Sequence, residues 1–495
     1  MAVLINTRMV TVANISLWKR VVVAASETQN LAALKAITAS ADGLQNGVLS
    51  FVPGLGLFQY SPASTATGDD INVIQPTSGT GRWIRTTQAA PIVNSSGQLL
   101  LSNIALGLYE VTVNGDGSGD FTEVNLALSA GFYRMVVTGN TIETNSFTFA
   151  DIQYDVHINI VPGVKIDCQA LDNVYDASTN GALVNFVVQG TGNPLRGGFV
   201  WSPTVESTLF NFTSAQPGSR VAINNAYIDT SGATASAYHG FIGGTDVSFF
   251  CEMPGFAFSN ATMSFIEAYN VFIDNPLFIG GGTTCASIVN CPNATVCIIK
   301  SPVFVNQFSS TTPVLSASNF ALDGAYNLAS ANLLINGINL TATNVREVVG
   351  GISFDFNVDA KSTISNCYLP NGTVFLSSTS TYTSLNSSMF ADLDESANPT
   401  EGETNICNVS FMLTQDFGTS EKVTWNLTNV NVYNEARISG RDVTWNGGAL
   451  GTASNSFNLT INAGATNALV TNLRTNSAIV NNEPTAMLGF NPTFS

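Results

Sequence analysis

Three charged side chains recur at one position of an imperfect repeat and are the first candidates for chemistry. Glu252, Asp274 and Lys300 each lie two residues before a proline, in the segments FFCEMPGF, VFIDNPLF and CIIKSPVF. If these segments are neighbouring strands of a stacked repeat, equivalent side chains lie about 5 Å apart. Two carboxyl groups at that separation suit a retaining glycosidase, in which one is the acid and the other the nucleophile. A solvated charge ladder without a catalytic role is the alternative.

Three aromatic residues are candidates for binding sugar rings, because the apolar face of a sugar packs on an aromatic ring. The candidates are Tyr238, Phe241 and Tyr269, although each could equally belong to a core. His157 and His239 have no companion histidine, cysteine or carboxylate at metal-ligand spacing. The sequence therefore predicts neither a metal site nor a cofactor.

The elements that must position these residues are the strands of a parallel β-helix. The segments align at a common corner, with spacings of 22, 26 and 22 residues, when the corner is placed at Pro254, Pro276, Pro302 and Gly324. Two residues after each corner stands an aromatic residue, and like rings on successive coils can stack inside a solenoid. These residues are Phe256, Phe278, Phe304 and Tyr326.

Composition narrows the class of protein. Of the 495 residues, 45% are hydrophobic and only 10% are charged, which excludes a disordered polyelectrolyte and a long coiled coil. The formal net charge of −17 repels phosphate backbones, so nucleic acid is not an expected partner. No run of about 18 apolar residues is present, so no membrane span is predicted. The start of the chain lacks the pattern of a signal peptide, and the 7 cysteines make a poor disulfide framework, which favours folding in a cytosol.

Two sets of motifs resemble a known family. SETQNLAALKAI, followed by FQY and GDDINVIQPTSGTGRWIR, is similar to the small head module of bacteriophage tail-spike and tail-fibre proteins. GDGSGDFTEV is similar to the opening of pectate-lyase-like β-helices. The resemblance implies a homotrimeric virion protein that attaches to other tail proteins through its N-terminal region and binds a host surface glycan. It places the chain in the virion tail, after assembly in the host cytoplasm. The Gln-Asp-Thr-Leu string of pectin esterases is absent, so that activity is not implied.

The sequence therefore predicts an all-β chain, a right-handed parallel β-helix with a small α+β head and a C-terminal β cap. The expected segments are an attachment arm at 1–20, the head at 21–88, a connector at 89–110, the β-helix at 111–440 and a trimerising cap at 441–495. Adhesion to host glycan is the first expected function. A polysaccharide depolymerase, either a glycoside hydrolase or a lyase, and a purely architectural virion protein are the alternatives.

Overall fold

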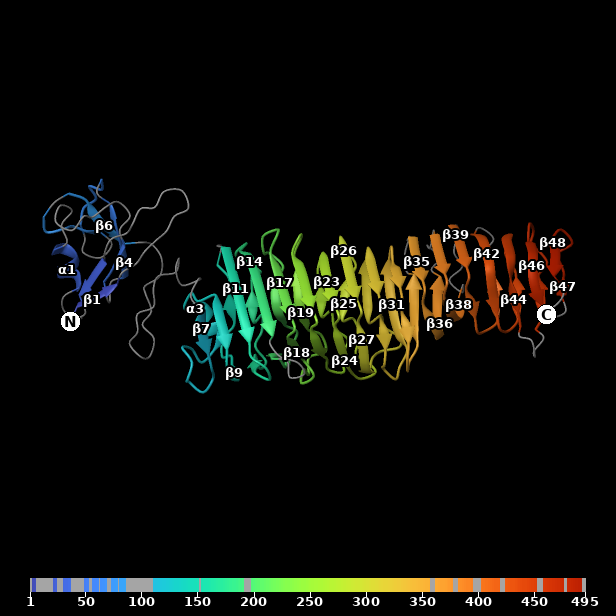
Figure 1. The fold of residues 1–495 in the computed structure, drawn as a ribbon, viewed down its shortest axis with the longest axis horizontal. Coiled ribbons are helices and arrows are strands. Elements are labelled where there is room, and N and C mark those ends of the chain that lie inside the picture. Colours follow the sequence, from blue (N-terminus) through green and yellow to red (C-terminus); the bar gives the residue numbers. More distant parts are fainter. Residues whose placement is uncertain are drawn as a thin grey trace. The chain divides into compact units, whose positions relative to one another are not determined.

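The computed structural model forms two compact units, one built mainly from residues 1–110 and the other mainly from residues 111–495 (Figure 1). The residues whose structure is described are 2–5, 21–24, 30–36, 49–52, 56–61, 63–68, 73–78, 80–85, 110–150, 153–190, 197–356, 361–376, 382–394, 402–418, 423–451, 457–475 and 479–491. The second unit carries the candidate site.

The N-terminal unit is a small α+β module. Its elements are β1 (Ala2–Ile5), β2 (Val21–Ala24), α1 (Asn30–Ala36), β3 (Leu49–Val52), β4 (Gly56–Ser61), β5 (Val73–Ile74) and β6 (Arg82–Arg85). Strand β1 pairs antiparallel with β2, and a four-stranded antiparallel sheet has the order β3-β4-β6-β5. Phe58, Tyr60, Ile74 and Trp83 are fully or almost fully buried, so alternating apolar residues supply its core.

The second unit is a parallel β-helix, as the repeat predicted. Its first sheet stacks one strand from each coil, and neighbouring strands are parallel. This sheet contains β8 (Arg134–Val137), β11 (Gln153–Ile160), β14 (Leu183–Gly190), β17 (Arg220–Asn224), β20 (Ser248–Glu252), β23 (Asn270–Asp274), β26 (Val296–Lys300), β29 (Phe320–Asp323), β32 (Thr341–Thr343), β35 (Lys361–Ser365), β37 (Tyr382–Asn386), β39 (Gly402–Cys407), β42 (Val423–Val432), β44 (Asp442–Leu450), β46 (Leu469–Thr475) and β48 (Met487–Asn491).

Two further stacks of parallel strands close each coil. The second sheet contains β9 (Thr141–Ile142), β12 (Lys165–Asp167), β15 (Gly198–Val200), β18 (Tyr227–Asp229), β21 (Gly255–Ala257), β24 (Leu277–Gly281), β27 (Val303–Gln307), β30 (Tyr326–Asn327), β33 (Arg346–Glu347), β36 (Tyr368–Leu376), β38 (Met389–Asp394) and β40 (Ser410–Phe411). The third contains β10 (Phe147–Thr148), β13 (Tyr175–Asp176), β16 (Thr208–Phe212), β19 (His239–Gly243), β22 (Ile266–Glu267), β25 (Val289–Cys291), β28 (Leu315–Ser318), β31 (Leu333–Ile338) and β34 (Ile352–Phe356). The late coils use β41 (Gln415–Phe417), β43 (Ala436–Ile438), β45 (Leu459–Ile461) and β47 (Ile479–Asn481).

The stack does not stop at residue 440. Strand β44 pairs in parallel with β42, β46 with β44, and β48 with β46. The segment assigned to a C-terminal cap therefore adds further coils of the same kind, and its trimerising role stays a prediction.

The predicted aromatic ladder forms inside the solenoid over three coils. The ring centroids of Phe256 and Phe278 lie 5.6 Å apart, those of Phe278 and Phe304 lie 5.3 Å apart, and all three side chains are fully buried. The fourth predicted member is wrong. Tyr326 pairs with Val303 and is 41% exposed, whereas Asn327 pairs with Phe304 and is buried. A coil that is one residue longer than the corner spacing suggested causes this difference, because a shift of one residue moves a side chain to the opposite face.

The turn after the strands of the first sheet repeatedly holds a residue in the left-handed region. Asparagine is the commonest choice, since its short amide tolerates this conformation and can hydrogen-bond locally. At Asn344, Asn366 and Asn408, φ is 56°, 54° and 54°. Asn366 Nδ2 donates to Asn344 Oδ1 over 2.5 Å, and Asn344 Nδ2 donates to Asp323 Oδ1 over 2.7 Å. The amides therefore link successive coils along this corner.

Replacing Asn366 by alanine is expected to destabilise the β-helix by about 1–3 kcal/mol, because the backbone strain is no longer tolerated and the coil-to-coil hydrogen bond is lost. Asn366→Gly keeps the conformation and should cost less. Urea unfolding of the full chain measures both variants. Equal losses for alanine and glycine would contradict the role given to the left-handed backbone.

The first coil is closed by β7 (Glu110–Val113) and the short helix α3 (Val124–Ser129). Asp120 and Glu123 have the spacing of a capping box just before this helix, but neither side chain caps it. Instead Asp120 Oδ2 accepts from Thr112, and the Glu123 carboxylate accepts from Thr144. The cap is the fully buried Glu143, whose carboxylate accepts from the first two helical N–H groups. A residue 19 positions away in sequence offered no local signal.

Burial raises the pKa of Glu143 above its ordinary value of 4.5, since desolvation outweighs the hydrogen bonds from Asn125, Val124 and Thr141. The folded protein therefore holds this proton more tightly than the unfolded chain, so its contribution to stability falls as pH rises above about 4.5. We expect the melting temperature of the wild type, minus that of Glu143→Gln, to decrease between about pH 4 and pH 7. A difference that is flat or rises with pH would contradict this assignment.

Candidate functional site

The predicted charged column exists on the outer face of the first sheet. Glu252 pairs in register with Asp274, and Asp274 with Lys300. All three side chains are exposed. The column continues to Asp323, which pairs in register with Lys300. The alignment of the four repeat segments missed this residue, because it placed the fourth segment one residue out of register. Hydrogen bonds from Thr343 and Asn344 hold the pKa of the Asp323 carboxyl below its ordinary value.

Two phenylalanine rings lie beside this column. Phe250 pairs with Phe272 in register, their ring centroids are 4.8 Å apart and their planes differ by only 5°. Both are half-buried, and Ile298 follows them on the next strand. Sequence reasoning missed these rings, although the signal was present. Each stands two residues before a column carboxylate and so shares its outward face.

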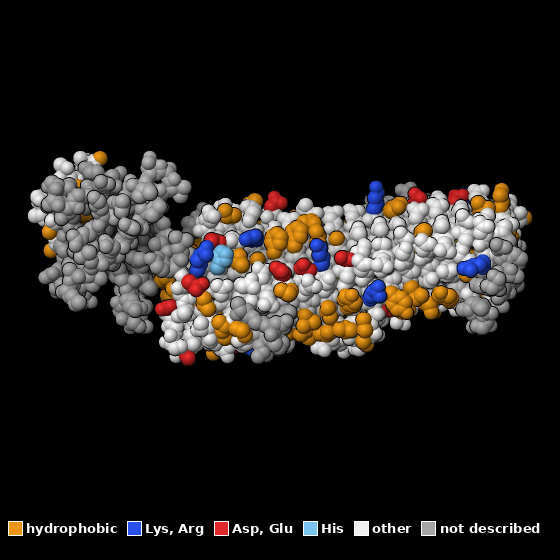
Figure 2. Space-filling model, viewed as in Figure 1, with side chains coloured by type: hydrophobic (Ala, Val, Ile, Leu, Met, Phe, Trp, Pro, Cys, Tyr) orange, Lys and Arg blue, Asp and Glu red, His pale blue; other side chains and the backbone are white. Residues whose placement is uncertain are grey.

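A groove of about 550 Å³ runs over these side chains, and we call it the sheet groove. Its walls combine an apolar strip with two carboxylates, an amide and two cations. It is lined by Val187, Arg220, Ala222, Asn224, Phe250, Cys251, Glu252, Phe272, Ile273, Asp274, Ile298 and Lys300. Figure 2 shows apolar side chains gathered over this part of the first sheet, with acidic and basic side chains beside them. The arrangement offers one apolar surface and several polar groups to the same ligand.

A polar network fixes one end of the groove. Arg220 Nε donates to Asn185 Oδ1 over 2.6 Å, and Asn185 Nδ2 donates to Asp155 Oδ1 over 2.5 Å. Asp155 also forms an ion pair with Arg134, at 3.2 Å, and its Oδ1 lies within hydrogen-bond distance of His157 Nε2, at 3.0 Å. Because Arg220 is held by this chain of contacts, its guanidinium has a defined place at the groove wall.

The two catalytic candidates lie side by side and open to solvent. Their strands are neighbours, so their backbones are about 5 Å apart and both carboxyl groups can reach one bound sugar. Asn275 Nδ2 donates to Asp274 Oδ1 over 3.0 Å. Within the described part of the chain, the Glu252 carboxylate has no hydrogen-bond partner, so it is available to a ligand.

Two of the three predicted sugar-stacking residues are wrong. Tyr238 and Phe241 are fully buried. The Tyr238 hydroxyl lies 3.0 Å from Thr230 Oγ1, and the ring of Phe241 stacks on Phe249 at 5.0 Å. Both side chains point into the core, and no sugar can reach them. Tyr269 is half-buried and lines neither the sheet groove nor the second pocket described below.

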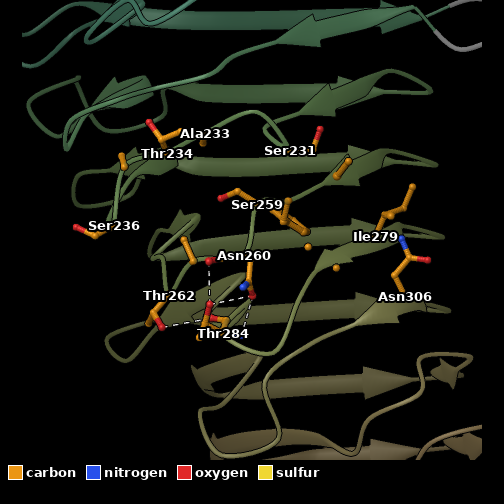
Figure 3. A pocket seen from close by; sticks show the side chains of 16 residues that line it. Ser231, Ala233, Thr234, Ser236, Ser259, Asn260, Thr262, Ile279, Thr284 and Asn306 are labelled. Carbon is orange, nitrogen blue, oxygen red and sulfur yellow. Dashed lines mark hydrogen bonds between the residues drawn. The ribbon is translucent and has the colours of Figure 1, made fainter.

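A second pocket of about 740 Å³ lies at the ends of strands of the second sheet, and we call it the hydroxyl pocket (Figure 3). Half of the 16 described residues that line it carry hydroxyl or amide side chains, and none of the 16 is charged. Sequence reasoning did not find it, because its walls come from loops of four successive coils. It is lined by Ser231, Ala233, Thr234, Ala235, Ser236, Ala257, Phe258, Ser259, Asn260, Ala261, Thr262, Ile279, Gly280, Gly281, Thr284 and Asn306.

Comparison with known proteins adds no family to this geometry. No protein-family model, no curated protein and no solved structure is significantly similar to the chain. Among the described residues, no helix is long and apolar enough to cross a membrane, and no three His, Cys, Asp or Glu side chains converge as a metal site would require.

Proposed function

We propose that this chain is a bacteriophage tail-spike or tail-fibre protein whose β-helix binds a host surface glycan in the sheet groove. The head-module motifs of residues 21–88 support the class of protein. The observation that carries the binding role is the Phe250–Phe272 ring stack beside exposed polar side chains. Sugar rings pack their C–H faces on aromatic rings, and their hydroxyls bond to carboxylates, amides and cations.

The homotrimer is part of this proposal, and an exposed apolar surface on the second sheet supports it. We call this surface the lateral stripe, and it comprises Leu277, Val303, Tyr326, Leu328, Val348 and Tyr368. Val348 is 58% exposed and Tyr368 is 50% exposed. Figure 2 shows apolar side chains along the lower part of the view, over these strands. Arg346 stands in register between Tyr326 and Tyr368, so one cation interrupts the stripe. Exposed apolar surface of this extent marks an interface, and parallel copies of one solenoid present the same stripe to a common axis.

The experiment is a mass measurement of the purified full chain, followed by binding to a glycan array and to bacterial cells. We expect three times the 52.1 kDa chain mass and retention of the protein on at least one surface glycan. A monomer that binds no glycan would refute the proposal. A trimer that binds no glycan and no cells would favour the alternative that the chain is a purely architectural virion protein.

A depolymerase is the second candidate, favoured by the in-register pair Glu252 and Asp274 within the groove. If the pair is catalytic, incubation with the bound polysaccharide releases new reducing ends. Asp274→Asn should then reduce this release by at least about a hundredfold, since removal of a nucleophile leaves little of the rate, while binding is retained. Release that is unchanged in Asp274→Asn and Glu252→Gln would exclude this pair.

A further inference from the structure

We propose that the hydroxyl pocket is a second binding site, separate from the sheet groove, and that its ligand is an uncharged saccharide unit. This inference goes beyond the proposed function, which concerns the first sheet only. The pocket has no lining residue in common with the groove.

The pocket is built by four successive coils. The loop after β18 forms one wall, the loop after β21 forms the base, and the ends of β24 and β27 form the opposite wall. Gly281 makes this packing possible, because a Cβ there would lie 2.3 Å from the carbonyl oxygen of Phe258. The loop after β21 can therefore lie directly against β24. At about 740 Å³, the space falls in the range of small-ligand sites.

The base of the pocket is held by hydrogen bonds between neighbouring loops. Asn260 Oδ1 accepts from the backbone N–H of Thr284 and from its hydroxyl, both over 2.9 Å. Thr262 Oγ1 donates to the carbonyl oxygen of Thr284 over 3.3 Å. Figure 3 shows these contacts at one side of the pocket. Because the protein makes these bonds itself, the base is organised before any ligand arrives, which lowers the cost of binding.

Other polar groups at the pocket remain available. In the described part of the chain, the side chains of Thr234, Ser236 and Asn306 make no hydrogen bond to another residue, and all three are exposed. Figure 3 shows Thr234 and Ser236 on one side of the space and Asn306 on the other. Two hydroxyls and one amide can both donate and accept, which matches the hydroxyl groups of a sugar.

The character of the walls selects an uncharged ligand. A bound ion would find no opposite charge in the lining, and the chain's net charge of −17 opposes an anion. Ala233, Ala261 and Ile279 are half-buried and supply apolar surface against which the C–H groups of a sugar can pack. Hydroxyl and amide groups above apolar surface complement a neutral saccharide and not a charged or a purely apolar molecule.

The test is saturation-transfer NMR of the full chain with the methyl glycosides of glucose, galactose, mannose and N-acetylglucosamine as probes. Ala233→Trp places an indole in the pocket mouth, and we expect it to abolish the transfer that remains in the Phe250→Ala background, where the sheet groove lacks one of its rings. Ala486→Trp is the matched control, because Ala486 and Ala233 are both half-buried residues of a turn. In each turn the alanine N–H donates to the carbonyl oxygen of the third preceding residue, which is Glu483 for Ala486 and Thr230 for Ala233. Thr234→Val and Asn306→Ala should each weaken binding about three- to tenfold.

The outcomes separate this site from the sheet groove. Transfer that is kept in Phe250→Ala and in Phe250→Ala/Ala486→Trp, lost in Phe250→Ala/Ala233→Trp, and unchanged between low and high salt supports the proposal, because no charge takes part. Transfer that is kept in Phe250→Ala/Ala233→Trp overturns it. Transfer to none of the four probes overturns it. Transfer that survives in Ala233→Trp but is lost in Phe250→Ala also overturns it, and assigns the saccharide to the sheet groove alone.

Discussion

Replacing both Phe250 and Phe272 by alanine is expected to weaken binding to the surface glycan by about a hundredfold. The two rings are stacked at 4.8 Å and form the largest aromatic surface of the sheet groove. Removing them leaves the polar groups in place but takes away the apolar surface on which a sugar packs. Titration of immobilised cells or of the array glycan with the purified variant measures the loss.

The matched control uses the same outward column farther along the sheet. Thr341 and Thr363 occupy the column position of Phe272 on strands β32 and β35, outside the groove. Their double replacement by alanine should leave binding unchanged. If both double variants weaken binding equally, the ligand lies along the whole sheet and the assignment to the groove is wrong.

Replacing Phe278 by alanine is expected to destabilise the chain by about 3–5 kcal/mol, the largest stability effect predicted for a single substitution. Its ring lies between those of Phe256 and Phe304, is fully buried, and its loss leaves a cavity inside the solenoid. Each coil rests on its neighbours, so the cavity weakens the packing of three coils at once. Urea or thermal unfolding of the full chain measures the change.

Phe272→Ala serves as the matched control for this prediction. It belongs to the same coil and is the same type of residue, but it lies half-buried on the outer face. We expect it to cost about 1 kcal/mol or less. Equal losses of stability in Phe272→Ala and Phe278→Ala would contradict the assignment of Phe278 to the core and of Phe272 to the outer face.

Local patterns in the chain were enough to predict a stacked parallel fold. Proline corners and alternating apolar residues recur once per coil, and the chain carries little charge. Each coil can bury its apolar face only against the next. The same repetition predicted that Glu252, Asp274 and Lys300 share one column, because their three segments have equal strand-to-corner spacing. The stacked strands confirm that column.

The fourth aligned segment shows where a pattern of this kind stops being sufficient. Gly324 matches the left-handed position of Ser301 and not the proline corner, so Asp323 joins the charged column and Tyr326 faces outward. The sequence does not reveal this shift of one residue, because glycine is acceptable both at the corner and at the left-handed position before it. Packing against the coil before it decides the register, because the wrong choice turns Phe320 and Leu322 out to solvent and Asn319 into the core.

The sequence by itself therefore determined the repeat, the parallel β-helix and the presence of a charged column. Only the tertiary structure decided which aromatic residues face outward, since Tyr238 and Phe241 are buried and Phe250 and Phe272 are accessible. It also decided that loops from four coils enclose a hydroxyl pocket around Thr284. The physical reason is the same in both cases. Composition and spacing state what one coil contains, whereas exposure and enclosure arise from the contacts between coils.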